Sequence, residues 1–161
     1  MALSNIALDS IGAARSIYQY AAHLEDNNNT EDTYPYYRDV RGFRNVLLVE
    51  LPNGDFADTV ARSLCFDTYQ FYFYTALQQS EDKHLAAIAE KSLKEVTYHR
   101  RFSSEWTVRL GDGTEESHQR MQRAIQEVWA YTGELFAMSA TETAMLQEGI
   151  VKTLVHFSSA I

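Results

Sequence analysis

The sequence predicts an all-α fold, a bundle of long antiparallel helices with no sheet. Apolar residues recur with a period close to 3.6 over several long windows, which indicates amphipathic helices. The 161 residues include only two Pro and seven Gly, too few for a fold made of short strands and turns. Hydrophobic residues make up 45% of the chain, which is enough for a packed core without disulfides. We therefore expect a single helical domain over residues 1–161.

The first expected helix runs from about Ser4, a good N-cap, to about Glu25. Its apolar stripe has helical spacing and consists of Ile6, Ser10, Ala13, Ile17, Ala21 and Leu24. The stretch from Asp26 to Asp39 is the longest loop candidate. A short helix is expected near Asp39 to Val49, because Pro52-Asn53-Gly54 then supplies strong turn chemistry.

Asp55 is expected to cap a third helix that reaches Gln79, and Ser80 a fourth from about Glu81 to Leu110. The stripe of the third helix contains Val60, Leu64, Asp67, Phe71 and Tyr74. The stripe of the fourth contains Leu85, Ile88, Ser92, Val96, His99, Ser103, Trp106 and Leu110.

Two more helices are expected in the C-terminal third of the chain. Thr114 can cap a fifth helix, which follows Gly111 and Gly113 and extends to about Met138. A sixth, shorter helix begins near Thr141 and stops before Gly149. The tail from Val151 to Ile161 is apolar and matches no clear pattern.

Composition excludes several classes of function. A net charge of −8 argues against nucleic acid as a partner, because phosphate binding needs a basic face. Apolar runs such as Val46–Val49 are far too short to span a membrane, and the first residues lack the pattern of a signal peptide. The single cysteine, Cys65, fits a reducing compartment, so we expect a cytoplasmic protein.

The segment Lys94–His99 is one residue away from a di-iron ligand motif. Di-iron carboxylate proteins of the ferritin-like class carry Glu-x-x-His on two helices of a bundle, so that both side chains reach the metal from one face. Here Val96 stands where that Glu would be. Glu95 is four residues before His99 and lies about 100° around the helix from the ligand position. The chain therefore looks like a ferritin-like protein whose metal site has lost its ligands.

His99 and Asp67 are the buried polar candidates. One interpretation is a core histidine with a hydrogen-bond partner, since one histidine cannot hold a catalytic metal alone. Asp67 lies between Leu64 and Phe71 on an apolar stripe, and a buried carboxylate needs a partner or a shifted pKa. We expect that partner to be His99 or an arginine. The other interpretation is that Asp67 and His99 survive from a metal shell.

Other candidate groups have simpler interpretations. Glu95 and His99 can be interpreted as an acid–base pair, but a surface contact of Glu95 with Arg100 or Lys91 is the favoured interpretation. Cys65 is expected to be a small buried hydrophobe. The aromatic run from Tyr69 to Tyr74 makes the third helix apolar on several faces, which fits either a thick core or a partner interface.

Four segments of the chain carry a resemblance to a known family: Ala7–Arg15, Asn45–Thr59, Lys94–Ser103 and Arg109–Thr114. Taken together, they resemble the non-catalytic C subunit of bacterial phenylacetyl-CoA epoxidase, and the resemblance extends from about Ala7 to about Gly149. Its most specific part is the block Leu-Pro-Asn-Gly-Asp-Phe-Ala-Asp-Thr at residues 51–59.

The resemblance implies a function. That enzyme is a multicomponent oxygenase that epoxidises the ring of phenylacetyl-CoA in aerobic phenylacetate catabolism. Its catalytic subunit is a related ferritin-like chain that keeps its di-iron ligands, and the C subunit is its structural partner. The implied role of this chain is therefore a scaffold subunit that binds no cofactor itself, with the di-iron centre in the catalytic subunit.

The resemblance also implies a degenerate metal site. We therefore expect no residue of this chain to bind a metal, to bind a cofactor or to act in catalysis. The catalytic relative reads Asp-Glu-x-Gly-His where this chain reads Asp9-Ser10-Ile11-Gly12-Ala13. The degenerate positions are Ser10, Ala13, Asp67, Val96 and His99. Ser10 and Val96 replace ligand Glu residues, Ala13 replaces a ligand His, and Asp67 and His99 retain acidic and imidazole groups.

The chain departs from the family at both ends. It begins at what resembles the second bundle helix, and its segment Thr153–Ile161 does not match. We expect the absence of a first helix to leave apolar residues such as Ile17 and Val96 in need of cover. The chain alone is thus expected to be a homo-oligomer.

Two alternatives to the scaffold role remain open. One is a metal-dependent oxygenase that uses Asp67, Glu95 and His99 with further ligands from another chain. The other is a stand-alone helical domain that self-associates.

Overall fold

The computed structural model describes residues 2–25 and 28–151, and this part of the chain is helical with no strand. The elements are α1 (Ala2–Glu25), α2 (Thr33–Tyr36), the 3₁₀ helix η1 (Val40–Gly42), α3 (Leu47–Glu50), α4 (Phe56–Leu77), α5 (Lys83–Gly111), α6 (Glu115–Trp129), the 3₁₀ helix η2 (Gly133–Phe136) and α7 (Ala140–Gln147). The predicted all-α fold is confirmed, as a ferritin-like antiparallel bundle.

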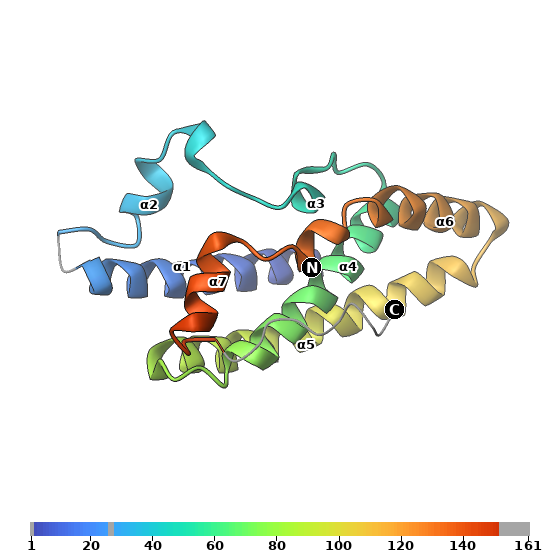
Figure 1. Cartoon of the computed structure of the whole chain (residues 1–161). Coiled ribbons are helices and arrows are strands. Elements are labelled where there is room, and N and C mark those ends of the chain that lie inside the picture. The colour runs from blue at the N-terminus through green and yellow to red at the C-terminus, as the bar shows by residue number, and fades with distance from the viewer. Residues whose placement is uncertain (1, 26–27, 152–161) are drawn as a thin grey trace.

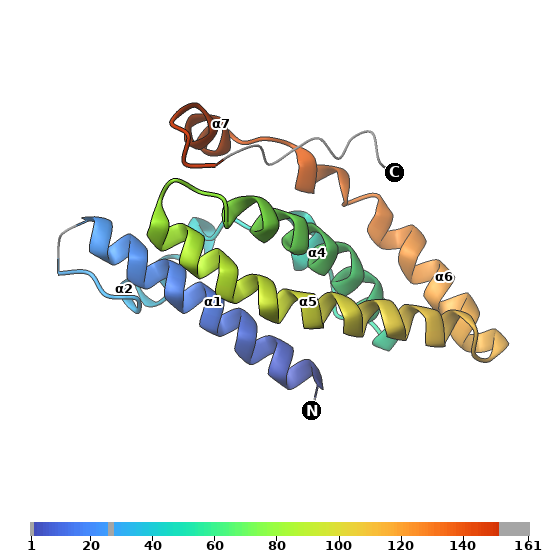
Figure 2. The same cartoon turned by 90° about the horizontal axis from the view of Figure 1, so that it is seen from below.

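The long helices alternate in direction. In Figure 1, α4 and α5 form an antiparallel hairpin, and α6 turns back from the end of α5 to pack beside the start of α4. Figure 2 shows α1 along the first half of α5 at the outer edge of the bundle, with the two helices diverging toward the N-terminus. The segment that carries α2, η1 and α3 runs as an arm from the end of α1 to the start of α4.

Two apolar clusters hold the bundle together. The first joins the N-terminal half of α4 to α3, α6 and η2, and it is made of Leu48, Ala57, Val60, Ala61, Met121, Ala124, Val128 and Leu135. The second joins the C-terminal half of α4 to α5 and Val151, and it is made of Tyr74, Leu77, Ala89, Val96 and Val151. Between the two clusters, the facing residues of α4 and α5 include the buried Asp67, His99 and Ser103.

Two of the four predicted N-caps are confirmed, Asp55 and Thr114. The prediction for Ser4 is wrong, because α1 begins at Ala2 and Ser4 lies inside the helix. Asp55 caps α4 by accepting hydrogen bonds from the backbone N–H groups of Ala57 and Asp58, and the Asp58 side chain accepts in return from the Asp55 N–H. Thr114 caps α6 as expected. The prediction that Ser80 caps the next helix is wrong, because Asp82 accepts from the first free N–H groups of α5 while Ser80 donates to the carbonyl of Ile150.

Other boundaries differ from the predictions. The helix expected near Asp39 to Val49 is two short pieces, η1 and α3, because Phe43 and Val46 adopt extended backbone between them. The fifth helix ends at Trp129 rather than near Met138, and η2 follows it. One turn of helix, α2, lies inside the predicted loop, and α7 begins at Ala140 with Ser139 as its cap. The expected mismatch at Thr153–Ile161 lies outside the described residues.

Helix α1 has no buried residue, although its predicted stripe suggests a core face. Ile17 is exposed, in agreement with the expectation that it needs cover. The same expectation is wrong for Val96, which is only 4% exposed because α4 packs over it with Tyr74 and Leu77.

The cap at Asp55 leads to a prediction about stability. Besides capping α4, the Asp55 carboxylate lies 3.4 Å from Nη2 of Arg123 and 3.5 Å from Nη1 of Arg120. Asp55→Ala should lower the free energy of unfolding by about 1–2 kcal/mol, since loss of an N-cap bond has that effect. Urea unfolding measures the change. Asp32→Ala is the matched control, because Asp32 precedes α2 without a side-chain cap bond and should change stability by less than about 0.5 kcal/mol.

Candidate functional site

The candidate site lies where α1, α4 and α5 meet. Helix α5 contributes His99 and Ser103, one turn apart on the face that it turns toward α4. Helix α4 contributes Asp67 from its middle turn, and α1 contributes Asp9. The side chains of Asp67, His99 and Ser103 are all 5% exposed or less. We call these four residues the polar layer.

The first contact of the polar layer joins α1 to α5. Nε2 of His99 lies 2.9 Å from Oδ2 of Asp9, and the His99 side chain is almost fully buried whereas Asp9 is partly exposed. An ionised carboxylate only accepts hydrogen bonds, so Nε2 carries the hydrogen and donates it to Asp9. This bond fixes the orientation of the imidazole ring and gives a buried donor its partner.

The second contact joins α4 to α5. Ser103 donates its hydroxyl hydrogen to Oδ2 of Asp67 over 2.9 Å, and the same hydroxyl lies 3.1 Å from the carbonyl of His99. Burial raises the pKa of Asp67 from its ordinary value of 3.8 to about 6, while the Ser103 bond and the nearby His99 oppose the rise. Asp67 is thus a carboxyl group that changes charge near neutral pH.

The structure corrects the predicted pairing. Asp67 does not form the expected hydrogen bond with His99 or with an arginine; its partner is Ser103, and the partner of His99 is Asp9. Sequence reasoning missed the roles of Asp9 and Ser103. Ser103 carried a signal, because it lies four residues after His99 on the same helical stripe. Asp9 carried none, since its contact with His99 spans 90 residues of sequence.

The positions that resemble lost ligands have ordinary structural contacts. Ser10 is exposed and donates its hydroxyl to the carbonyl of Ile6 over 2.9 Å. Ala13 is half-buried and has no side-chain donor atom. Val96 is buried in the second apolar cluster. In the part of the chain that the structure describes, no group of three or more His, Cys, Asp or Glu side chains lies close enough together to hold a metal ion.

The donor atoms of the polar layer do not fit a di-iron centre. Such a site takes a Glu from each of two helices and a Glu-x-x-His motif from each of the other two. Here Asp9 and His99 are bonded to each other, and Asp67 is bonded to Ser103. The expectation that this chain binds no iron remains a prediction.

The remaining candidates are ordinary parts of the packing. The predicted surface pair of Glu95 with Arg100 or Lys91 is not found among the described residues. The guanidinium of Arg100 lies instead 4.6 Å from the centre of the Phe71 ring.

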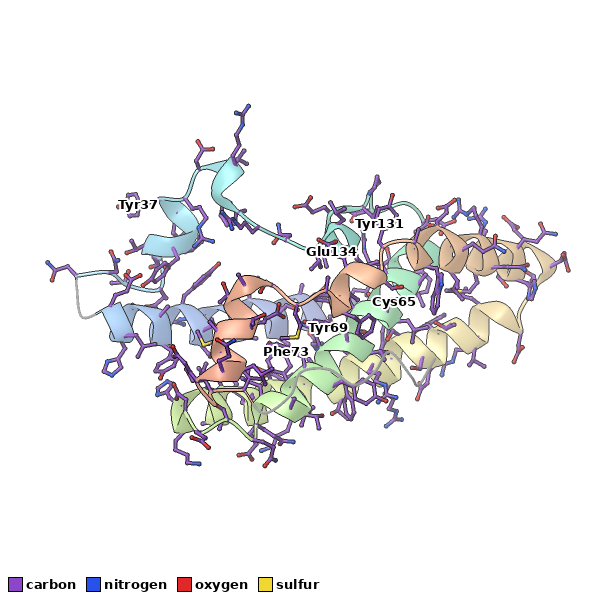
Figure 3. All side chains as sticks on the ribbon, in the orientation of Figure 1. Tyr37, Cys65, Tyr69, Phe73, Tyr131 and Glu134 are labelled. Atoms are coloured by element: carbon purple, nitrogen blue, oxygen red, sulfur yellow. The ribbon has the colours of Figure 1, made fainter. Side chains whose placement is uncertain are left out.

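Cys65 is half-buried against the first apolar cluster, and burial raises the pKa of its thiol, as expected for a packing residue. Figure 3 shows Cys65, Tyr69 and Phe73 along α4. Most of the aromatic run packs in the core, and Tyr72 is the exposed member.

The fold defines a class: a ferritin-like helical bundle, in which a polar layer joins α1, α4 and α5. A model of the family described as phenylacetic acid catabolic protein matches residues 1–158. The chain belongs to this family. It is also 48% identical, over 150 residues, to the C subunit of the 1,2-phenylacetyl-CoA epoxidase of Escherichia coli strain K12.

The match covers unequal shares of the two proteins. The alignment includes 93% of this chain but 60% of the relative, so the chain spans about three fifths of the curated protein that it matches. These similarities establish the family of the chain, and the name of the relative implies that the relative has partner subunits. Within the described residues, no helix has the length and apolar character needed to cross a membrane.

Asp67 leads to a prediction about pH. The pKa of Asp67 is higher in the folded chain than its ordinary value, so the folded state binds the proton more tightly than the unfolded state does. The stability of the folded chain should therefore fall as pH rises from about 4 to about 6. Asp67→Asn removes this charge and keeps an acceptor for Ser103. The variant should be more stable than the original at pH 7.5, by on the order of 2 kcal/mol, and no more stable below pH 4.

Urea unfolding at a series of pH values measures this difference. Asp112→Asn serves as the control, because Asp112 is an exposed carboxylate at the end of α5 and should leave the pH profile unchanged. An Asp67→Asn profile parallel to that of the original chain across pH 4–7.5 would contradict the raised pKa of Asp67.

Proposed function

We propose that this chain is a non-catalytic scaffold subunit of a multicomponent phenylacetyl-CoA ring epoxidase, and that it pairs with the di-iron catalytic subunit. The proposal places it in the cytoplasm, where its single cysteine, Cys65, is free. In the absence of the catalytic subunit we propose that the chain self-associates.

The observation that carries this proposal is the polar layer. In place of a set of metal ligands, the polar side chains of the layer bond in pairs, the partly exposed Asp9 of α1 with the buried His99 of α5, and the buried Asp67 of α4 with the buried Ser103 of α5. Paired in this way, the buried donors and acceptors are satisfied and contribute to holding the three helices together. The catalytic chemistry would then belong to another subunit, while this chain supplies a folded surface.

The 48% identity to a protein named as the C subunit of an epoxidase supports the same interpretation. The rival proposal, an oxygenase that uses Asp67, Glu95 and His99, has weaker support. The imidazole of His99 is already bonded to Asp9, and ligation by His99 would require that bond to break or the ring to use its other nitrogen.

Co-purification tests the pairing. The untagged chain is co-expressed with a tagged di-iron catalytic subunit of a phenylacetyl-CoA epoxidase. We expect the two to elute together in equal amounts, and the complex, but not this chain alone, to convert phenylacetyl-CoA when it is supplied with O2 and a two-electron reductant. If both proteins are folded by circular dichroism and elute separately at micromolar concentration, the proposed pairing is wrong.

Iron content tests the scaffold role separately. After anaerobic loading with ferrous iron and desalting, elemental analysis should find well under one iron per chain, because Ser10, Ala13 and Val96 offer neither carboxylate nor imidazole. The catalytic subunit, treated in parallel, is the positive control and should retain close to two irons. Two tightly held irons in this chain would refute the non-catalytic assignment.

A further inference from the structure

The turn between α3 and α4 contains the only Asn-Gly pair of the sequence, Asn53-Gly54. The turn leads directly into α4, and both residues are exposed (Figure 1). Gly54 has a φ of +59°, in the left-handed region that glycine adopts without strain. Because glycine has no β-carbon, nothing on this residue obstructs the approach of its backbone nitrogen to the side-chain amide of Asn53. The pair is therefore a candidate site of self-modification.

The modification that this pair can undergo is an intramolecular acyl transfer. The backbone nitrogen of Gly54 attacks Cγ of Asn53 and loses its proton, and the new bond closes a five-membered succinimide ring. The bond from Cγ to Nδ2 breaks, and the side-chain nitrogen leaves as ammonia. Water then adds to one of the two ring carbonyls, which yields an aspartate or a β-aspartyl linkage. Asparagine and water become aspartate and ammonia, so the reaction needs no oxidant, reductant or cofactor.

The guanidinium of Arg62 is placed to promote the first step. Its Nη2 lies 3.2 Å from Oδ1 of Asn53, the oxygen on which negative charge develops when Cγ is attacked. A donor at that oxygen stabilises the charge as an oxyanion hole does. Arg62 is itself held against the turn, since its Nη1 donates to the carbonyls of Leu51 and Pro52. The cation thus stays beside the oxygen that acquires the charge.

The two nitrogens that take part in the reaction are not engaged elsewhere. Within the described part of the chain, neither the N–H of Gly54 nor the side-chain amino group of Asn53 forms a hydrogen bond. The attack therefore breaks no hydrogen bond of either nitrogen. Asn45 is the contrasting case, because its amino group donates to Oε1 of Glu50 and the β-branched Val46 follows it.

The product of the reaction would alter the start of α4. The backbone of Gly54 lies directly against Asp58, so that a β-carbon on Gly54 would overlap the Asp58 carboxylate. Oδ2 of this carboxylate accepts from the N–H of Asp55 over 2.8 Å, which is one half of the capping box of α4. A β-aspartyl linkage adds one methylene to the backbone just before Gly54, and there is no room for the longer chain beside the box.

We propose that Asn53 is a site of spontaneous deamidation, that Arg62 promotes the reaction, and that the product weakens the N-terminal cap of α4. The chain then carries a slow chemical change of its own at the start of its central helix. The proposal concerns only the turn and the first turns of α4, and it holds or fails independently of the proposed scaffold role.

Mass spectrometry of the folded chain, incubated near neutral pH, tests the site. We expect the intact mass to rise by the difference between a carboxyl and an amide group, and peptide mapping to place the change at Asn53 before any appears at Asn45. Asn53→Gln is the matched control: it keeps the amide but needs a six-membered ring, so its mass should stay unchanged over the same time. An Asn53 that stays intact for weeks, or a faster change at Asn45, overturns the proposal.

The rate of this change tests the role of Arg62. We expect Arg62→Gln to slow it by on the order of ten-fold, less than the loss of a buried oxyanion-hole donor does, because water competes in an exposed turn. Arg62→Lys keeps a cation and should retain part of the rate. The original chain should also react more slowly when unfolded in guanidinium chloride, where the contact with Arg62 is lost. An equal or faster rate in folded Arg62→Gln, or in the unfolded chain, shows that Arg62 does not promote the reaction.

Urea unfolding tests the effect on the cap. The modified chain carries one more negative charge, so ion exchange separates it from the unmodified chain of the same incubation. We expect the modified chain to unfold at a lower urea concentration than the unmodified chain, whereas Asn53→Gln incubated in parallel should keep its midpoint. Equal midpoints for the modified and unmodified chains would show that the change at Asn53 does not reach the cap of α4.

Discussion

The packing of α4 against α5 is the contact on which the rest of the molecule depends. The buried residues of α5 are spaced at helical intervals along one face, from Ile88 to Ser103, and α4 covers them. Helix α6 then packs on the start of α4, and α1 on the first half of α5. Because both outer helices attach to this hairpin, loss of the α4–α5 contact would release the whole bundle.

The polar layer shows how a core face can accept polar residues in the middle of an apolar contact. It lies between the two apolar clusters, and each of its groups meets a partner on another helix. Unsatisfied, such groups would lower stability by several kcal/mol, whereas paired they can fix which turns of α1, α4 and α5 face each other. The charged form of Asp67 is still disfavoured, since burial raises the pKa of this carboxyl toward neutrality.

Helix α1 is attached to the body in a different way from the others. Its contacts with α5 are largely polar and aromatic: Asp9 bonds to His99, and Tyr20 bonds to Asp82 and stacks on His84 with ring centres 4.3 Å apart. It buries no side chain fully. An element with so little buried apolar area is expected among the first to open when the protein fluctuates.

The sequence by itself determined the helical class, the extents of α1, α4 and α5 to within a few residues, and the caps at Asp55 and Thr114, because periodicity, capping and turn chemistry are local properties. It also identified Asp67 and His99 as the polar residues of apolar stripes.

Only the tertiary structure decided their partners, Ser103 and Asp9, and the burial of Val96, because these depend on which helices meet and at which turn. The broken helix before Pro52 was decided in the same way: Leu48 is fully buried against the first cluster, and the N–H of Leu47 donates to Glu134, 87 residues away. Contacts across such distances leave no periodic signal in the chain, so no local pattern could have predicted them.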